Sequence, residues 1–223
     1  MKTISLRLKA IAGMVKNTSV IDVGTDHALL PVYMCKNGLV YKVVACDVNK
    51  GPLEAAKKNI AKNGLNDVIE TRQGSGIRPV LPGECETLVI AGMGGSLIID
   101  LLLESIEKSK TFKQLILQPQ RSLYKLRKFL ISNGFFIKNE LLVKENKIFY
   151  YILDVAPGMI EHYSEAELHF GKYVHINNPV DFRMYIEHEI QKYEKLISKH
   201  KAGELAENYL KMCISIIGGA DTG

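Results

Sequence analysis

The sequence contains no apolar run that approaches the ~20 residues of a membrane-spanning helix. Its beginning, "MKTISLRLKAIAGMV", places charged residues between the apolar ones and so lacks the continuous apolar core of a signal peptide. With 47% apolar and 24% charged residues, the composition is that of a globular protein. We therefore expect a protein of the cytoplasm that does not bind membranes.

Paired cysteines are also absent. The spacing of the four cysteines is that of neither a zinc site nor a disulfide framework; they are Cys35, Cys46, Cys85 and Cys213. Five of the six histidines lie in the C-terminal part of the chain and do not have the spacing of metal ligands. These patterns predict reduced thiols and no metal ion.

Charge is unevenly distributed along the chain. Residues 1–155 contain 22 Lys and Arg against 14 Asp and Glu, a net charge of +8, whereas residues 156–223 carry a net charge of −3. An excess of positive charge in the larger part is expected of a protein that meets a polyanion such as a nucleic acid. An ordinary lysine-rich surface would explain the same charge, so charge alone does not decide between the two.

Short apolar runs rich in Val and Ile alternate with helical patterns over the first two thirds of the chain. The runs predict parallel strands at 19–24, 42–48, 68–73, 87–92 and 114–119. Helices are predicted between and after them at 28–37, 50–63, 94–108 and 121–133. Two further strands, which form a hairpin around the polar "KEN", are predicted at 135–143 and 147–155. Together they predict an α/β fold, a doubly wound sheet of seven strands with an antiparallel edge.

The sequence pattern changes after residue 157. Apolar positions three and four residues apart predict a helix at 181–201, and a second helix is predicted at 203–217, ending at the Gly218-Gly219 pair. Two helices in succession indicate a helical hairpin. We expect a larger domain over residues 1–157 and a small, coiled-coil-like helical subdomain over residues 158–223.

The stretch "VIDVGTDHALLP" ends a predicted strand with a single glycine, Gly24. A dinucleotide-binding loop needs the pattern G-x-G-x-x-G so that backbone amides approach a pyrophosphate closely. Here Asp26 and Leu29 occupy the second and third glycine positions. A carboxylate ~4 Å from a phosphate charge costs about 4 kcal/mol at an effective dielectric constant of about 20. S-adenosylmethionine, which has an adenosine, a positive sulfonium and no phosphate, fits this loop better.

The next two predicted strands also end in polar groups. Asp47 ends "VVACD", 23 residues after Gly24, where an acidic residue binds the two hydroxyls of a ribose. The third strand ends in "QGSG", whose glycines allow close backbone approach and whose Ser75 is placed to hydrogen-bond an adenine edge. Ordinary turn residues would explain any one of these loops, but three successive loops favour a nucleoside site.

The fourth and fifth strands end in loops that suit a methyl acceptor. The fourth ends in "AGMGGSLI", with three glycines within four residues at the start of a helix, so that backbone can approach a bulky group. The Asn-Pro-Pro-aromatic motif of enzymes that methylate exocyclic amino groups is absent, which favours a ring nitrogen as the target. The fifth leads into a basic helix with Arg121, Lys125 and Lys128 on one face, which contacts phosphates or is simply solvated.

These motifs together resemble the bacterial tRNA (adenine(22)-N1)-methyltransferase family. The matching pieces, in family order, are "SLRLKAIA" (5–12), "DVGTDHALLP" (22–31), "GPLEAAKKNI" (51–60), "QGSG" (73–76), "AGMGG" (91–95), "LILQP" (115–119) and "NGFFIKNELLVKENKIFYYIL" (133–153). The chain departs from the family at Leu29, Ser75 and Gln120, where the family often has Tyr, an acidic residue and Asn. The resemblance implies a class I methyltransferase domain of the Rossmann-like type. It also implies S-adenosylmethionine as methyl donor and N1 of adenine 22, in the D-arm of tRNA, as acceptor.

The predicted site residues form two groups. Contacts to the cofactor are expected from Asp22, Gly24, Thr25, Asp26, His27, Asp47, Val48, Gly74, Ser75, Gly76, Ala91, Gly92, Met93 and Gly94. Contacts to the RNA are expected from Arg7, Gln118, Gln120, Arg121, Lys125 and Lys128. Asp26 and His27 are the candidate catalytic residues, because a carboxylate near the acceptor stabilises the positive charge that passes to the purine. His27 orients Asp26, hydrogen-bonds the base or is only structural.

Two other hypotheses stay open at this point. In one, the chain methylates another RNA base or a small molecule. In the other, it is a binding module that senses S-adenosylmethionine or binds RNA without catalysis. Transfer of a labelled methyl group to tRNA would separate both from the first hypothesis.

Overall fold

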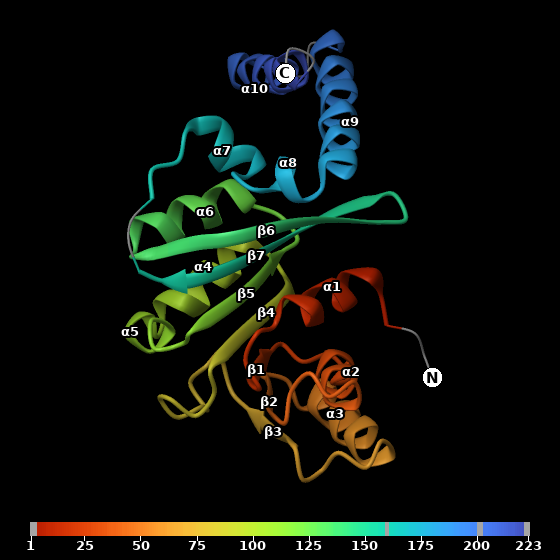
Figure 1. Cartoon of the computed structure of the whole chain (residues 1–223), viewed down its shortest axis with the longest axis vertical. Coiled ribbons are helices and arrows are strands. Elements are labelled where there is room, and N and C mark those ends of the chain that lie inside the picture. The colour runs from red at the N-terminus through yellow and green to blue at the C-terminus, as the bar shows by residue number, and fades with distance from the viewer. Residues whose placement is uncertain (1–3, 159–160, 200–202, 221–223) are drawn as a thin grey trace. The chain divides into compact units, whose positions relative to one another are not determined.

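The computed structural model describes residues 4–158, 161–199 and 203–220. It divides the chain into two compact units, an N-terminal unit of residues 1–162 and a C-terminal unit of residues 163–223. In the N-terminal unit, seven strands form one sheet in the order β3-β2-β1-β4-β5-β7-β6 (Figure 1). That residues 1–157 and 158–223 are separate domains stays a prediction.

The strands confirm the predicted α/β sheet. Strands β1 to β5 are parallel, and β7 runs antiparallel to both of its neighbours, β5 and β6. The bounds are β1 Ser19–Val23, β2 Lys42–Asp47, β3 Ile69–Gln73, β4 Thr87–Met93, β5 Gln114–Pro119, β6 Phe135–Glu145 and β7 Ile148–Pro157. The strand order reverses between β1 and β4, and open α/β sheets bind their ligands at such a switch point.

The helices of the N-terminal unit are α1 Leu6–Met14, α2 Leu29–Lys36, α3 Lys50–Lys62, α4 Gly95–Leu103, α5 Ile106–Ser109 and α6 Leu123–Ser132. The alternation of strands and helices in the sequence does not predict α1. Ser5 caps the N-terminus of this helix, because its Oγ accepts a hydrogen bond from the Leu8 N–H at 3.2 Å. The single helix predicted at 94–108 is wrong, because the backbone leaves helical geometry at Ser105 (φ −148°, ψ 50°) and separates α4 from α5.

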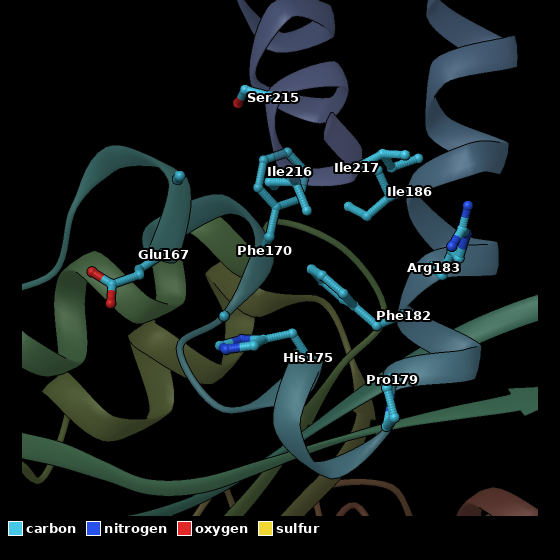
Figure 2. A pocket seen from close by; sticks show the side chains of 12 residues that line it. Glu167, Phe170, His175, Pro179, Phe182, Arg183, Ile186, Ser215, Ile216 and Ile217 are labelled. Carbon is cyan, nitrogen blue, oxygen red and sulfur yellow. The ribbon is translucent and has the colours of Figure 1, made fainter. Parts of the chain in front are cut away.

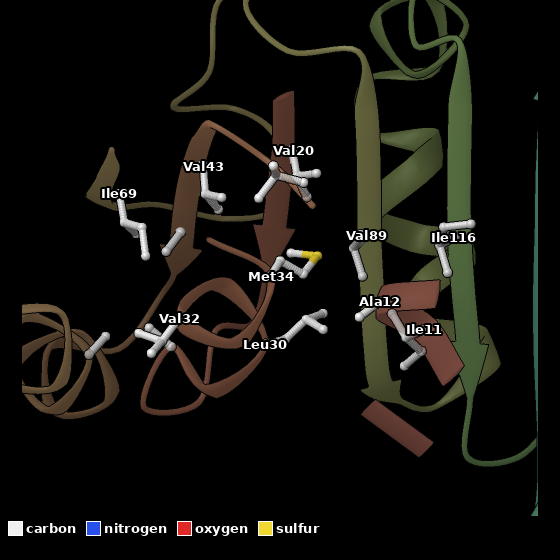
Figure 3. Close-up of a cluster of buried hydrophobic side chains, with 14 of the residues drawn as sticks. Ile11, Ala12, Val20, Leu30, Val32, Met34, Val43, Ile69, Val89 and Ile116 are labelled. Atoms are coloured by element: carbon white, nitrogen blue, oxygen red, sulfur yellow. The ribbon is translucent and has the colours of Figure 1, made fainter. Parts of the chain in front are cut away.

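One face of the sheet packs against α1, α2 and α3. Alternate side chains of the strands, such as Val20, Val43 and Val89, meet apolar residues of these helices, among them Ile11 and Met34. Figure 3 shows this cluster of side chains, and all five of these residues are almost completely buried. The close packing fixes β1 and β4 beside each other, and the ends of these strands carry two of the loops singled out in the sequence.

The opposite face of the sheet packs against α4 and α6 and contains a buried ion pair. Arg127 Nε of α6 donates a hydrogen bond to Glu140 Oε1 of β6 at 2.7 Å, and neither side chain is exposed. The Arg127 guanidinium also lies 5.0 Å from the ring centre of Tyr151. One basic residue of α6 therefore belongs to the core, whereas Lys125 and Lys128 of the same helix are exposed.

The described part of the C-terminal unit contains the helices α7 Glu165–Phe170, α8 Val174–Asn177, α9 Pro179–Ser198 and α10 Glu204–Ala220. Helices α9 and α10 form the predicted pair: the ring centres of Tyr193 and Tyr209 lie 4.5 Å apart, and the Tyr209 hydroxyl donates to Glu189 at 3.1 Å. The predicted helix end at Gly218-Gly219 is wrong, because α10 continues to Ala220; a glycine inside a helix costs only about 1 kcal/mol. The predicted end of the first helix at residue 201 lies outside the described residues.

The C-terminal unit also contains a pocket of about 590 Å³ with a mainly apolar lining. Figure 2 shows Phe170, Phe182, Ile186 and Ile216 around it, contributed by α7, α9 and α10. Within the described ranges, none of the helices combines the length and apolar character that crossing a membrane requires.

Candidate active site

A pocket of about 380 Å³ lies at the carboxyl ends of β1, β2 and β4, beside the switch point of the sheet. Its size falls within the roughly 300–1,000 Å³ of small-molecule sites. It is lined by Arg7, Leu8, Asp22, Gly24, Asp26, Leu29, Leu30, Asp47, Ala91, Gly92, Met93 and Gln120. The tertiary structure thus brings the first, second, fourth and fifth strand-end loops together with α1 and the start of α2.

The first loop requires a glycine at position 24. Gly24 has a φ of +74°, and its N–H donates a hydrogen bond to the Cys46 carbonyl at 2.8 Å, which ties the loop to β2. A Cβ at this position would collide with Met93 Cε of the fourth loop. The glycine therefore allows two loops of the pocket to touch.

The residues that follow Asp26 form a strained turn. His27 and Ala28 both have left-handed backbone conformations, with φ of 56° and 50°. Such conformations cost about 1–3 kcal/mol each in non-glycine residues and persist where the surroundings fix them. The His27 carbonyl accepts a hydrogen bond from Asn59 Nδ2 of α3 at 2.8 Å, which holds the turn before α2 begins at Leu29.

Asp26 and His27 lie close together at the mouth of the pocket. His27 Nε2 is 3.5 Å from Asp26 Oδ1, and the two side chains are 59% and 80% exposed respectively. Asp26 lines the pocket, whereas His27 does not. The arrangement places a carboxylate at the entrance, with an imidazole in position to orient it.

Asp22 is the most buried of the three carboxylates that line the pocket. Burial raises its pKa from 3.8 to about 6, the nearby Thr25 hydroxyl partly offsets this, and the nearby Asp47 raises the pKa further. A positive charge beside Asp22 would lower this pKa again. At neutral pH the interior of the pocket therefore favours a cationic ligand.

Asp47 lines the pocket from the end of β2. Its Oδ1 accepts a hydrogen bond from the Asn49 N–H at 2.8 Å, which orients the carboxylate. The third loop lies beside it, because the Gly74 N–H donates to the Asp47 carbonyl at 3.0 Å. The remaining predicted cofactor residues of these two loops do not line the pocket; they are Val48, Gly74, Ser75 and Gly76. The Ser75 hydroxyl instead donates to Glu104 at 3.3 Å, so its contact with an adenine stays a prediction.

The fourth and fifth loops are joined through their backbones. The Gln120 N–H donates to the Met93 carbonyl at 2.8 Å, and the Gly95 N–H donates to the Arg121 carbonyl at 2.9 Å. A Cβ at Gly95 would lie 2.7 Å from that same carbonyl oxygen, so the approach requires glycine. These bonds place Gln120 in the pocket lining and Arg121 next to Gly94.

The residues predicted to contact RNA occupy three environments. Arg7 and Gln120 line the pocket, and three exposed side chains lie outside it: Arg121, Lys125 and Lys128. Gln118 has no exposed surface and accepts hydrogen bonds from Arg7 Nη1 and the Gly92 N–H. A fully buried side chain does not contact an RNA, so the predicted contact of Gln118 does not fit the structure.

Three leucines of the pocket, Leu8, Leu29 and Leu30, are not among the predicted site residues. The sequence "SLRLKAIA" suits an amphipathic helix, but helix periodicity does not indicate which strand ends the helix covers. Thr25, His27 and Gly94 are predicted cofactor residues that do not line the pocket. In the described part of the chain, no group of three or more His, Cys, Asp or Glu side chains is arranged to hold a metal ion.

A seven-stranded sheet with an antiparallel β7, and a carboxylate-lined pocket at its switch point, define a class I methyltransferase of the Rossmann-like type. The family described as "Methyltransferase domain" matches residues 4–153. With the relatives that follow, this places the chain in the tRNA (adenine(22)-N1)-methyltransferase family.

The relatives agree in sequence and in structure. The chain is 34% identical over 156 residues to the tRNA (adenine(22)-N(1))-methyltransferase of Bacillus subtilis, a match that covers 70% of this chain and 66% of that protein. A crystal structure of Streptococcus pneumoniae Sp1610, a putative tRNA (m1A22) methyltransferase in complex with S-adenosyl-L-methionine, superimposes with a TM-score of 0.88 at 29% identity. It covers 96% of this chain and 99% of that chain. M. capricolum TrmK in complex with S-adenosyl-homocysteine superimposes with a TM-score of 0.84 at 27% identity, over 96% of this chain and 98% of that chain.

Proposed function

We propose that this chain transfers the methyl group of S-adenosylmethionine to N1 of adenine 22 in tRNA. The observation that carries the proposal is the set of three carboxylates that line the pocket at the β1–β4 switch point, within a chain of this family. The reaction takes place in the cytoplasm, where tRNA is found and thiols stay reduced.

The pocket residues fit this cofactor by their charge and position. Asp22 and Asp26 supply negative charge next to the first loop, where a sulfonium and an ammonium are stabilised and a pyrophosphate would be repelled. Asp47 has a carboxylate in the position that accepts hydrogen bonds from two ribose hydroxyls. Gly24 and Gly92 both have positive φ and allow backbone to approach the ligand closely.

S-adenosylmethionine, when bound, supplies an electrophilic methyl group on a positive sulfur. Adenine N1 has an in-plane lone pair and no proton, so the N1–carbon bond forms as the carbon–sulfur bond breaks, and no base is needed. The positive charge passes to the purine ring, and Asp26 at the mouth of the pocket stabilises it there. The work of the chain is to align N1 with the methyl group and to exclude water.

Exposed basic residues at and beyond the fifth strand end suit the tRNA backbone. Arg121 follows the pocket residue Gln120 and precedes α6, whereas Lys125 and Lys128 lie on that helix. Phosphate contacts from these side chains orient the tRNA without reading its sequence. Because N1 is engaged in Watson–Crick pairing, the target base must be unpaired or flipped out.

Incubation with labelled S-adenosylmethionine and total tRNA, followed by nucleoside analysis, tests the proposal. We expect the label in 1-methyladenosine and its loss from a tRNA transcript with guanosine at position 22. Label in another nucleoside would mean a different RNA base, and binding of S-adenosylhomocysteine without any transfer would mean a binding module.

A further inference from the structure

The cofactor pocket contains one cationic side chain among its three carboxylates. Arg7 of α1 lines the pocket, and its Nη1 lies 3.5 Å from the place that a Cβ on Gly92 would occupy. Helix α1 is not one of the strand-end elements from which the carboxylates come. A ligand with only positive charge and hydroxyl groups would gain nothing from a guanidinium here, so the Arg7 side chain indicates an anionic group on the same ligand.

The Arg7 side chain is held by a buried acceptor. Gln118 Oε1 accepts a hydrogen bond from Arg7 Nη1 at 2.5 Å and a second from the Gly92 N–H at 3.1 Å. The Gln118 Nε2 donates to the Pro119 carbonyl at 2.9 Å, and the residue has no exposed surface. Rotating the amide by 180° would turn its NH₂ group toward two donors, so the network fixes its orientation.

Two further contacts fix the helix that carries Arg7. The guanidinium lies 5.4 Å from the ring centre of Tyr150 on β7. The Leu6 N–H at the start of α1 donates to Glu145 Oε1 at 2.7 Å, which ties the helix to the β6–β7 hairpin. Gln118 uses one of the five N–H donors of Arg7, and a fork of donors held in this way suits a carboxylate.

We propose that Arg7 binds the carboxylate of the amino-acid end of the cofactor and that Gln118 positions Arg7 for this contact. The inference rests on the proposed function in so far as it takes S-adenosylmethionine as the ligand. That ligand has two positive groups and one carboxylate. The pocket matches this pattern, with Asp22 and Asp26 for the positive groups and Arg7 for the carboxylate. Arg7 thereby selects the complete cofactor over adenosine derivatives without a carboxylate.

Calorimetry with two ligands tests the contact of Arg7. The ligands are S-adenosylhomocysteine and its decarboxylated analogue, which keeps the amine, the thioether and the nucleoside. We expect Arg7→Gln to weaken binding of S-adenosylhomocysteine by about 10-fold or more and to change the Kd of the analogue less than about twofold. Arg183→Gln is the matched control, because Arg183 is exposed, does not line the cofactor pocket and pairs with Glu187; it should change neither Kd.

Each other outcome would overturn the proposed role of Arg7 or the proposed function. If Arg7→Gln weakened the binding of both ligands equally, Arg7 would have a structural role. If both Kd values were unchanged and the KM for tRNA rose, Arg7 would contact RNA instead of the cofactor. If the unaltered protein failed to bind S-adenosylhomocysteine, the proposed function would fall with the inference. If it bound and Arg7→Gln had no effect, only the inference would fall. Thermal unfolding without ligand checks that each variant is folded.

A double-mutant cycle tests the positioning role of Gln118. We expect Gln118→Leu to weaken binding of S-adenosylhomocysteine by about threefold to 10-fold, and to add nothing when Arg7 is already Gln. The decarboxylated analogue should bind Gln118→Leu normally. Additive effects, or equal weakening of both ligands, would show that Gln118 acts through the Gly92 backbone instead and would overturn its proposed role.

Discussion

The two units of the chain contain pockets of opposite character. The pocket of the C-terminal unit is the larger, at about 590 Å³ against about 380 Å³, and its lining is mainly apolar. The smaller pocket of the N-terminal unit has three carboxylates and a guanidinium, all contributed by strand ends and α1. The comparison teaches that size does not identify the proposed cofactor site here. Charged groups held at a topological switch point do.

The physical difference lies in what each pocket requires of its surroundings. Charged side chains stay inside the smaller pocket because a packed sheet and strained loops hold them. Holding them there lowers the stability of the unliganded protein, and the free energy of ligand binding offsets this loss. The walls of the larger pocket are apolar rings and aliphatic chains, such as Phe182 and Ile186, whose burial stabilises the helices around them. Substitutions in the first pocket should therefore alter chemistry and binding, and substitutions in the second should alter stability.

The largest effect is expected for Asp26→Ala. Turnover of tRNA should fall by about 10²- to 10³-fold, because the carboxylate stabilises charge that develops only in the transition state. The Kd of S-adenosylhomocysteine should rise much less. Kinetics with saturating cofactor and calorimetry measure the two quantities, and Asp100→Ala, an exposed carboxylate of α4 outside the pocket, is the control. Equal losses in turnover and in affinity would assign Asp26 to binding alone.

Phe182→Ala should affect stability instead of binding. Phe182 is 7% exposed and packs in the larger pocket, so its truncation should cost about 3 kcal/mol in the free energy of unfolding of the C-terminal unit. Denaturant unfolding measures this loss. The Kd of S-adenosylhomocysteine should stay within about twofold of its original value, and a larger change would contradict the expectation that substitutions in this pocket alter only stability.

Asp22→Asn should stabilise the protein while it weakens cofactor binding. A buried carboxyl with its pKa raised from 3.8 to about 6 lowers stability at neutral pH, because the folded state disfavours its charged form. This cost is absent below pH 3.8 and complete above pH 6. Removing the charge should therefore raise the unfolding free energy at pH 7.5 by about 3 kcal/mol. A variant that is less stable at pH 7.5 would show that the charged form of Asp22 is stabilised by its surroundings.

The smallest effect is expected from pH. If binding requires ionised Asp22, with its pKa of about 6, the affinity for S-adenosylhomocysteine should fall about fourfold between pH 7.5 and pH 5.5. Calorimetry across this range should show the fall in the unaltered protein. In Asp22→Asn the affinity should be lower and independent of pH. If the affinity of this variant still fell with pH as in the unaltered protein, the titration would belong to a different group.

Particular residues show where sequence reasoning succeeded. The short apolar runs rich in Val and Ile predicted the five parallel strands, because burial on both faces leaves a continuous apolar pattern. Asp22, Gly24, Asp26 and Asp47 could be placed at one edge because parallel strands point the same way. Arg7 and Gln118 were both assigned to RNA. Only the structure shows that one side chain is buried and holds the other, since this pairing spans 111 residues.

The sequence by itself determined the strands in their order along the chain, the negative charge of the first loop and the likeness to one enzyme family. These properties are local, and periodicity, turn chemistry and charge suffice to define them. Tertiary structure alone decided that α1 reaches the strand ends, that Met93 packs on Gly24 and that Asp22 titrates near pH 6. Contacts and desolvation of this kind depend on groups far apart in the chain, so a local sequence pattern does not predict them.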